Sequence, residues 1–471
     1  MRAMTADPNL FCTPAAFGRR CVEVLRPALF TRRAPKQLSA TAYLDGLRGF
    51  AALLVYWMHH QIWARMGPGP FGDILEYGYG YDGKRYFACL PVVRMFFTGG
   101  HIAVVIFFVI SGYVLSAKPL RLIQAGELVK LDDNVASALF RRWARLYIPC
   151  AVTTFLFATS WHLFNISTFW PRHQWTYRAE VWTWYAEFKN WSFLFRPADA
   201  YFFSYNVHLW SIPVEFRGSI MVYATLMALS RSSRNARLCA EVVLIFFFLC
   251  VVDGWNLALF IGGMHICDLA QLAERKDLPR IYALFEPYKV YVSYILLILG
   301  VLLSGVPTPD PKVERLREQP GWYYLSFLTP SAMSDYKWFY LFFAATFIVA
   351  SAPNISWLKR FFETRFCQYL GRISFSLYLV HGPLLWTVGN RLYLAAGWPK
   401  DDLAPDLVPW LNLYPLPRIG PFGLEPNFLL PQMILLPLTL WVAEMATKGC
   451  DEPALKFPRW LYKKMEAPPC T

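Results

Sequence analysis

Apolar residues along this chain gather in long runs, and charged residues lie mainly between the runs. A run of about 20 apolar residues can cross the hydrocarbon core of a bilayer as a helix. The pattern predicts ten such spans, at about residues 49–66, 100–117, 146–165, 208–230, 238–253, 255–273, 288–306, 337–352, 371–392 and 428–447. The predicted fold is therefore all-α, a polytopic membrane bundle of about ten transmembrane helices.

Composition agrees with a membrane protein. Of 471 residues, 56% are hydrophobic and 17% are charged, whereas about a quarter of a soluble domain is usually charged. The net charge of +14 would suit nucleic acid if it formed one patch. Because the charges are spread between apolar runs, the predicted partner is membrane lipid, and no nucleic acid is expected.

The distribution of Lys and Arg orients the predicted spans. With the N-terminus in the cytosol, cytosolic segments hold 30 of these residues and the opposite segments hold 15, while Arg217 lies inside a span. Positive charge concentrates on the cytosolic side of membrane proteins. We therefore expect a multi-pass protein with both termini cytosolic. Since no other address is visible, we expect it in the endoplasmic reticulum or another secretory membrane.

The pattern predicts one domain between two short cytosolic segments. Residues 1–40 form a basic N-terminal segment, 41–450 the transmembrane domain and 451–471 a tail. Long loops are predicted on the far side at 67–99, 166–207, 307–336 and 393–427. Loops of this length are usually functional. The aromatic rings of the second loop suit either an interfacial belt or stacking on a flat acceptor.

Cysteines and sequons add little chemistry. The ten cysteines are scattered without a CxxC pair, which favours small buried residues over a disulfide or metal framework. No metal is expected. Of the sequons at Asn165, Asn190 and Asn354, only Asn190 is predicted to be a luminal glycosylation candidate.

The first predicted helix carries polar residues at unusual depth. Asp45 and Arg48 begin it, and His59 and His60 follow. Eleven residues separate Arg48 from His59, about 16 Å at helical rise, so His59 lies near mid-membrane. Adjacent helical residues point about 100° apart, so both histidines cannot face one site. An imidazole there can act as a general base, or it can simply bond to another helix.

Two other spans offer small or cationic groups. Ser111 and Gly112 allow close helix approach, and Tyr113 adds a hydroxyl. No GxSxG elbow surrounds Ser111, so it is not predicted to be a nucleophile. Arg142 and Arg145 share a helix face. They suit either the phosphates of coenzyme A or an anchor on anionic lipid.

Two later segments place polar groups inside apolar runs. Glu215 could orient an imidazole or pair with an arginine for structure alone. Ser374, Tyr378 and His381 form a polar stripe along one helix face, which predicts the lining of a cavity.

Five segments together resemble the acyltransferase 3 family of integral-membrane acyltransferases. They occur in the family's order between residues 43 and 383: YLDGLRGFAALLVYWMH, FFVISGYVLS, RRWARLYIP, LWSIPVEF and LGRISFSLYLVH. The resemblance implies a ten-helix bundle that transfers an acyl group, usually acetyl, from acyl-CoA to a hydroxyl. The long loops and aromatic richness look most like stand-alone fungal members.

The resemblance also assigns residues. The family's essential histidine corresponds to His59, which is expected to be the general base. Further catalytic candidates are Glu215, His381 and Tyr378. The candidates for holding the acyl-CoA donor are Arg48, Arg142, Arg145, Ser111 and Tyr113. Tyr113 or Tyr378 could also steady the oxyanion.

The expected function is membrane-bound O-acyl transfer. Because no soluble SGNH-type domain accompanies the chain, a small lipophilic acceptor is favoured over a glycan. Direct transfer and an acyl-histidine relay through His59 both remain open. The alternative is a polytopic transporter or flippase, but the sequence contains no paired repeats of the kind that transporters often show.

Overall fold

The computed structural model describes residues 22–27, 38–168, 173–195, 202–401 and 403–466. Helices dominate these residues, as predicted. Their one sheet is a two-residue antiparallel pair, β1 (Gly80–Tyr81) and β2 (Lys84–Arg85). The all-α class is therefore confirmed. Of the predicted N-terminal segment, residues 1–21 and 28–37 lie outside the described residues.

The helices fall into long elements that build the bundle and short ones that lie in its loops. The long elements are α2 (Ala42–Arg65), α4 (Gly100–Gln124), α5 (Leu128–Phe164), α6 (Tyr177–Trp191), α7 (Ser211–Ala228), α8 (Arg234–Phe246), α9 (Trp255–Glu274), α11 (Lys289–Ser304), α14 (Lys337–Ser351), α16 (Arg365–Leu384), α18 (Pro426–Ala446) and α19 (Glu452–Met465). The short ones are α3 (Phe71–Ile74), α10 (Arg280–Ala283), α12 (Val313–Arg317), α13 (Tyr323–Ser326), α15 (Ser356–Phe362) and α17 (Asn390–Ala395).

Turns of other helical types connect or extend these elements. The 3-10 turns are η3 (Phe87–Cys89), η4 (Val93–Phe96), η6 (Ser204–Trp210), η8 (Glu286–Tyr288), η9 (Ala352–Asn354) and η11 (Val408–Trp410). The π-helical turns are η7 (Phe247–Val251), η10 (Leu385–Gly389) and η12 (Thr447–Asp451).

A helix lies in each of the ten predicted spans, but the count of ten spans is not confirmed. By length and composition, five helical stretches within the described residues could each cross a membrane. The pair formed by residues 337–354 and α15, bent by 100°, would make a sixth if it counts as one span. Other long helices of the bundle, such as α2, are not among these stretches. The apolar helices support an integral membrane protein. They do not determine how many times the chain crosses the membrane.

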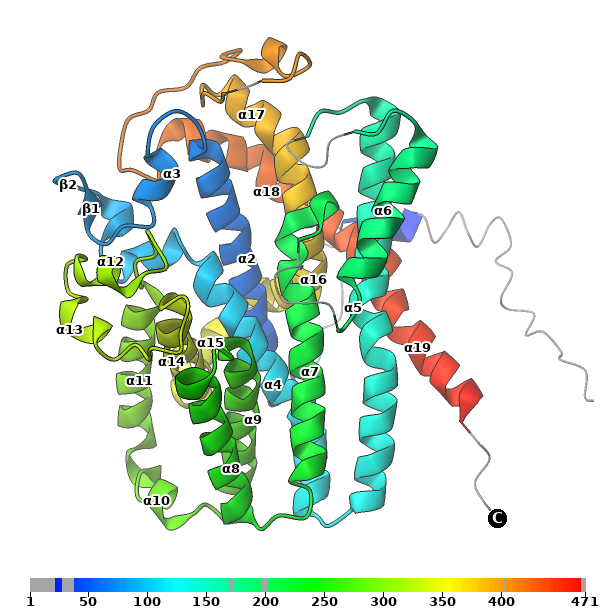
Figure 1. Ribbon diagram of the computed structural model, residues 1–471, viewed down its shortest axis with the longest axis vertical. Coiled ribbons are helices and arrows are strands. Elements are labelled where there is room, and N and C mark those ends of the chain that lie inside the picture. Colours follow the sequence, from blue (N-terminus) through cyan, green and yellow to red (C-terminus); the bar gives the residue numbers. More distant parts are fainter. Residues whose placement is uncertain (1–21, 28–37, 169–172, 196–201, 402, 467–471) are drawn as a thin grey trace, which may run out of the picture.

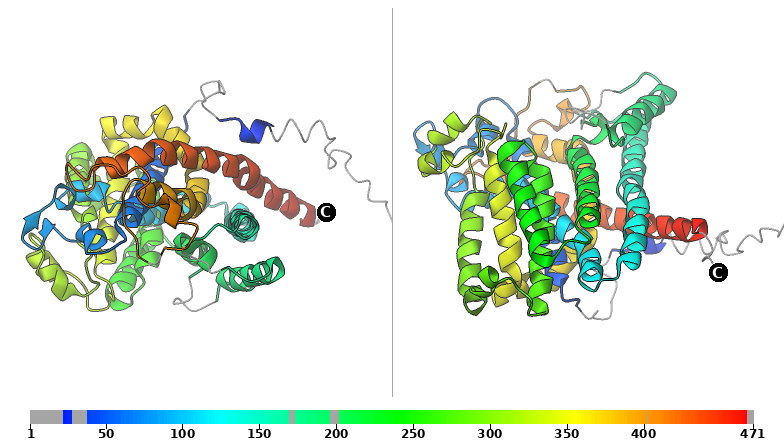
Figure 2. Two further views of the ribbon diagram at one scale, coloured as in Figure 1. Left: turned by 90° about the horizontal axis from the view of Figure 1, so that it is seen from above. Right: turned by 60° about the horizontal axis from the view of Figure 1, so that its bottom comes forward.

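The long loops gather at one end of the bundle. In Figure 1, α3, β1, β2, α12, α6 and α17 lie in the upper part, while α10 and the short connections lie at the bottom. We call the upper end the loop end. Seen from above in Figure 2, α18 and α19 run across the bundle, and α19 projects beyond it toward the C-terminus. The four long loops were predicted to lie on one side of the membrane, and their position at one end of the bundle agrees with that prediction.

Residues far apart in sequence meet where α2 packs on α16. Glycines let the two backbones touch, because a Cβ on Gly49 would lie 2.2 Å from the Gly371 nitrogen. A Cβ on Gly371 would lie 2.3 Å from the Asp45 carbonyl oxygen. Arg48 adds a hydrogen bond to the Gly371 carbonyl at 3.1 Å. This close approach brings the histidines farther along both helices together.

Two loops at the loop end are joined through Glu76. The Thr308 N–H donates to the Glu76 carbonyl at 2.9 Å, and the Thr308 hydroxyl donates to the Glu76 carboxylate. His101 lies 3.3 Å from that carboxylate. Burial raises the pKa of the Glu76 carboxyl, but the neighbouring His101 and Arg94 together lower it by more. The pKa of Glu76 therefore lies below its ordinary value. The ionised carboxylate thus holds residues 67–99 against residues 307–336.

Candidate active site

Three histidines from separate elements form one cluster. His59 comes from α2, His208 from η6 and His381 from α16. The His59 ring centroid lies 4.2 Å from that of His208 and 5.1 Å from that of His381, and the His208 and His381 centroids are 4.8 Å apart. His381 is buried, while His59 and His208 keep part of their surface accessible. The structure therefore joins two predicted residues with a third that the sequence analysis did not select.

Hydrogen bonds indicate which nitrogen carries the proton in two of the three rings, those of His381 and His59. His381 Nδ1 lies 2.9 Å from the Tyr378 carbonyl and 3.2 Å from the Leu377 carbonyl. A carbonyl only accepts, so Nδ1 of His381 carries the proton and its Nε2 carries a lone pair. His59 Nδ1 lies 2.9 Å from that Nε2 and must donate to it. His59 Nε2 is left with a lone pair, which is the state that a general base requires.

His208 is held against the other two rings by a close backbone contact. A Cβ on Gly382 would lie 2.2 Å from His208 Nδ1, so only glycine fits there. Asn206 Nδ2 donates to the Leu379 carbonyl at 2.8 Å and ties η6 to α16. His208 Nδ1 itself is buried without a hydrogen-bond partner among the described residues. The signal in the sequence was its place at the head of the segment that contains Glu215.

His60 belongs to a different network, as predicted from helix geometry. Its Nδ1 lies 2.6 Å from the Tyr393 hydroxyl, and Gln432 donates to that hydroxyl. The expectation that adjacent histidines cannot share one site is therefore confirmed. One ring nitrogen of each histidine in the cluster lies within 4.8 Å of the others, as a metal site would require. However, the bond between His59 and His381 already uses one nitrogen of each ring.

A pocket of about 580 Å³ lies toward the end opposite the loops. Its lining comes from α2, α4, α5, α7 and α16, and from η12 and α19. The polar residues that line it are Arg48, Ser111, Arg142, Arg145, Ser211, Glu215, Arg372, Ser374, Tyr378, Thr447, Asp451 and Glu452. The predicted donor arginines and the predicted polar stripe at Ser374 and Tyr378 thus meet in one cavity. We call it the arginine pocket.

Glu215 pairs with an arginine and not with a histidine. Its carboxylate accepts a hydrogen bond from Ser111 at 2.7 Å and forms an ion pair with Arg142. Arg142 also donates to Ser219 at 2.7 Å. Of the two roles that the sequence allowed Glu215, the structure shows the arginine pair. Arg142 is therefore largely neutralised and fixed in place.

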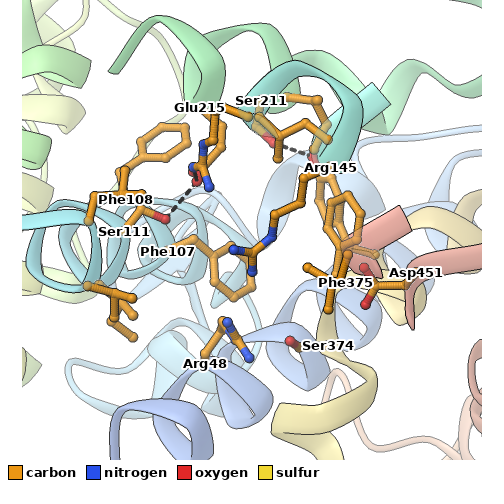
Figure 3. Close-up of a pocket in the computed structure, with 18 of the residues that line it drawn as sticks. Arg48, Phe107, Phe108, Ser111, Arg145, Ser211, Glu215, Ser374, Phe375 and Asp451 are labelled. Carbon is orange, nitrogen blue, oxygen red and sulfur yellow. Dashed lines mark hydrogen bonds and ion pairs between the residues drawn. The ribbon is translucent and has the colours of Figure 1, made fainter. Parts of the chain in front are cut away.

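Arg145 is the cation that the protein leaves available. Its guanidinium makes no hydrogen bond or ion pair with the part of the chain that the structure describes. Figure 3 shows it extending into the pocket toward Arg48 and Phe107. Arg48 pairs with Asp45 at 3.2 Å, and Arg372 lies 3.2 Å from Glu452. Arg145 thus contrasts with its three arginine neighbours.

Tyr378 connects the pocket to the histidine cluster. It lines the pocket, and its ring centroid lies 5.7 Å from that of His381. Its hydroxyl lies 2.7 Å from the Ser211 hydroxyl and donates to the His208 carbonyl. Through these bonds Tyr378 holds η6 and α16 together. Because its hydroxyl proton is already donated to the His208 carbonyl, Tyr378 is poorly placed to donate to an oxyanion.

Two findings differ from the expected site map. Tyr113 lies outside the pocket lining, and its side chain interacts with Tyr43. The segment predicted as a separate tail instead continues from α18 through η12 into α19. Asp451, Glu452 and Leu455 of that segment line the pocket. Nothing in its polar, basic sequence indicated contact with the site.

The arrangement combines a basic nitrogen with an adjacent cationic cavity. A neutral imidazole with a free lone pair can remove a proton from a hydroxyl. A guanidinium without a partner can bind a phosphate or another anion. Tyr378 spans the short distance between the two. The geometry therefore suits the transfer of a group from an anionic carrier to a hydroxyl.

Comparison with known proteins identifies the family. The acyltransferase 3 family model, described as an acyltransferase domain, matches residues 41–442. The chain is 31% identical over 423 residues to the O-acetyltransferase PaAT-1 of Phomopsis amygdali, covering 81% of this chain and 79% of that protein. No solved structure matches significantly.

Two more distant fungal relatives agree. Acyltransferase R4 of Phoma sp. is 24% identical over 409 residues, and acyltransferase clz18 of Cochliobolus lunatus is 24% identical over 412. Each match covers 76% of this chain and 86% of the relative. With the family model matching most of its length, the chain belongs to the acyltransferase 3 family and is an acyltransferase.

Proposed function

We propose that this protein is an acyl-CoA-dependent O-acyltransferase, with acetyl-CoA as its donor and His59 as the general base. The observation that carries the proposal is the 2.9 Å bond from His59 Nδ1 to His381 Nε2. With the His381 proton held by backbone carbonyls, that bond leaves the lone pair of His59 on Nε2. No metal takes part in the proposed chemistry.

The donor is proposed to occupy the arginine pocket. Arg145 meets a phosphate of coenzyme A, while Arg48 and Arg142 add to the positive potential. Glu215 and Ser111 hold Arg142 in position. The pocket's volume of about 580 Å³ is in the range of small-molecule sites. The thioester then lies near Tyr378, next to the histidines.

The proposed reaction balances through His59. Its Nε2 removes the proton of the acceptor hydroxyl, and the oxygen attacks the thioester carbonyl. When the tetrahedral intermediate collapses, the carbon–sulfur bond breaks and the thiolate of coenzyme A leaves. The imidazolium returns its proton to that sulfur, which releases free coenzyme A. His381 holds the imidazole in the reactive tautomer and acts as a positioning residue.

The acceptor is proposed to be a hydroxylated small lipophilic metabolite, as in secondary metabolism, in preference to a glycan. The similarity to an O-acetyltransferase and two acyltransferases of fungi supports an acyl acceptor without naming it. We further propose that the end opposite the loops faces the cytosol, where acyl-CoA is made, together with both termini. A secretory membrane such as the endoplasmic reticulum suits that orientation.

The test uses purified full-length protein in nanodiscs with radiolabelled acetyl-CoA and a panel of hydroxylated terpenoids, polyketides and sugars. We expect acceptor-dependent release of free coenzyme A and labelled product. His59→Ala should abolish both. His60→Asn is the matched control, because the next residue on α2 faces Tyr393, and it should keep activity.

The label also separates the alternatives. Labelled product without labelled protein supports direct transfer. Label retained on His59 in the absence of acceptor would instead support an acyl-histidine relay. Failure of the wild type to bind or turn over any acyl-CoA would overturn the proposal. Equal losses in His59→Ala and His60→Asn would overturn the assigned base.

A further inference from the structure

A second cluster of metal-type ligands lies at the loop end, away from the active site. His162 is in the last turn of α5, His173 is in the following loop, and Glu180 is in the first turn of α6. One donor atom of each residue lies within 4.8 Å of the others. Neither the proposed chemistry nor the sequence motifs account for this group.

Each imidazole of this cluster has a ring nitrogen that makes no hydrogen bond with the described residues. His162 Nδ1 lies 3.5 Å from Glu180 Oε2, and it is buried without a hydrogen-bond partner in the described part of the chain. His173 Nε2 lies 2.8 Å from the Ile166 carbonyl. That carbonyl places the ring proton on Nε2 and the lone pair on Nδ1. A metal-binding histidine usually donates its other N–H in this way.

The carboxylate of Glu180 is buried, and both of its oxygens accept hydrogen bonds from neighbouring residues. Glu180 is 3% exposed. The Tyr205 hydroxyl donates to its Oε1 at 2.5 Å, and the Gln174 N–H donates to its Oε2 at 2.9 Å. These bonds orient both oxygens, as outer-shell partners do for a ligating carboxylate. The arrangement differs from the catalytic cluster, where two histidines bond to each other.

We propose that His162, His173 and Glu180 form a site for a divalent transition-metal ion of the Zn²⁺ type. Two imidazoles and one carboxylate are a common zinc ligand set, with a fourth position left for water. His173 is exposed, so an ion can enter from the surrounding medium. A bound ion would join the end of α5, the loop after it and the start of α6 into one unit.

The test measures metal in the intact protein. Full-length protein in detergent is stripped with a chelator, titrated with Zn²⁺ or Co²⁺, desalted and analysed by elemental mass spectrometry. We expect about one ion per chain, absorption typical of nitrogen- and oxygen-bound Co²⁺, and a higher thermal unfolding midpoint with Zn²⁺. His173→Ala, an exposed substitution that leaves the core intact, should weaken binding by about tenfold or more.

Two control variants make the result specific. His101→Ala removes a histidine that also faces a carboxylate, Glu76, but has no third ligand. His59→Ala disrupts the catalytic cluster. Both should retain the ion. The proposal would be overturned if the wild type bound no more metal than His173→Ala. It would also be overturned if His59→Ala lost the ion and His173→Ala kept it.

Discussion

The histidine cluster and the arginine pocket lie next to each other, yet they handle charge in opposite ways. In the cluster, His59 and His381 share one hydrogen bond, and no carboxylate among the described residues bonds to any of the three rings. In the pocket, four arginines face three carboxylates, those of Glu215, Asp451 and Glu452. One region contains rings that bond to each other, and the other pairs arginines with carboxylates.

This difference explains how a polar site can persist within an apolar bundle. A buried charge needs a partner, and each charge costs several kcal/mol without one. Neutral imidazoles avoid that cost while still offering a basic nitrogen. The pocket pairs Arg48, Arg142 and Arg372 with carboxylates, and among the described residues Arg145 makes no hydrogen bond or ion pair. Under the proposed function, substitutions in the two regions should affect different kinetic constants.

The largest effect is expected in the histidine cluster. His59→Ala should lower kcat by roughly 10²–10⁴-fold, because general base catalysis supplies about that factor. The KM for acyl-CoA should stay within about twofold, since a lost transition-state contact leaves ground-state binding unchanged. Steady-state kinetics with an identified acceptor would measure both. A rise in KM with unchanged kcat would place His59 in binding instead.

A smaller effect on the other constant is expected in the pocket. Arg145→Ala should raise the KM for acyl-CoA by roughly 10–100-fold, because a hydrogen bond to a charged group contributes about 1.5–3 kcal/mol. Here kcat should change little. Lys130→Ala is the control, since Lys130 is an exposed residue of the same helix that pairs with Glu127. Equal effects of the two substitutions would show that general positive charge, and not Arg145, matters.

His208 tests whether the third ring positions the first. His208→Ala should lower kcat by about tenfold, because small misplacements of a catalytic group are costly, with KM unchanged. His208→Phe, which keeps a flat ring beside His59, should recover part of the loss. If His208→Phe is as inactive as His59→Ala, then His208 takes part in proton transfer itself.

The smallest effect is expected outside both regions. Glu76→Gln should lower the free energy of unfolding by about 1–3 kcal/mol through lost hydrogen bonds, while kcat and KM stay unchanged. The folded pKa of Glu76 lies below its ordinary value of 4.5, so its ionised form stabilises the fold. That contribution is complete above pH 4.5 and is lost as the pH falls through the folded pKa. Unfolding measured at pH 7 and pH 4 should show the gap between wild type and variant shrinking.

The sequence predicted the helices and many of the candidate site residues because their signals were local. Apolar runs located the helices, and helix geometry separated His59 from His60. The family resemblance selected His59, His381 and the arginines. These inferences needed only neighbouring residues or the order of motifs.

The remaining features depend on contacts between distant segments. The difference between Arg142 and Arg145 arises because Glu215, on another helix, reaches only Arg142. His208 joins the cluster because Gly382 lets η6 approach α16. The last helix enters the pocket through a π-helical turn that no sequence pattern marked. Residue spacing within one segment carries no information about such contacts.

The contact between α2 and α16 also has a consequence for how the protein is made. His59 and His381 are 322 residues apart. At about 5–20 residues per second, a ribosome takes roughly 15–60 seconds to travel between them. Throughout that interval, α2 carries an imidazole without its partner and a glycine-lined face without its neighbour. Chains interrupted before α16 would therefore expose that face, a mark by which cellular quality control could distinguish unfinished copies from complete ones.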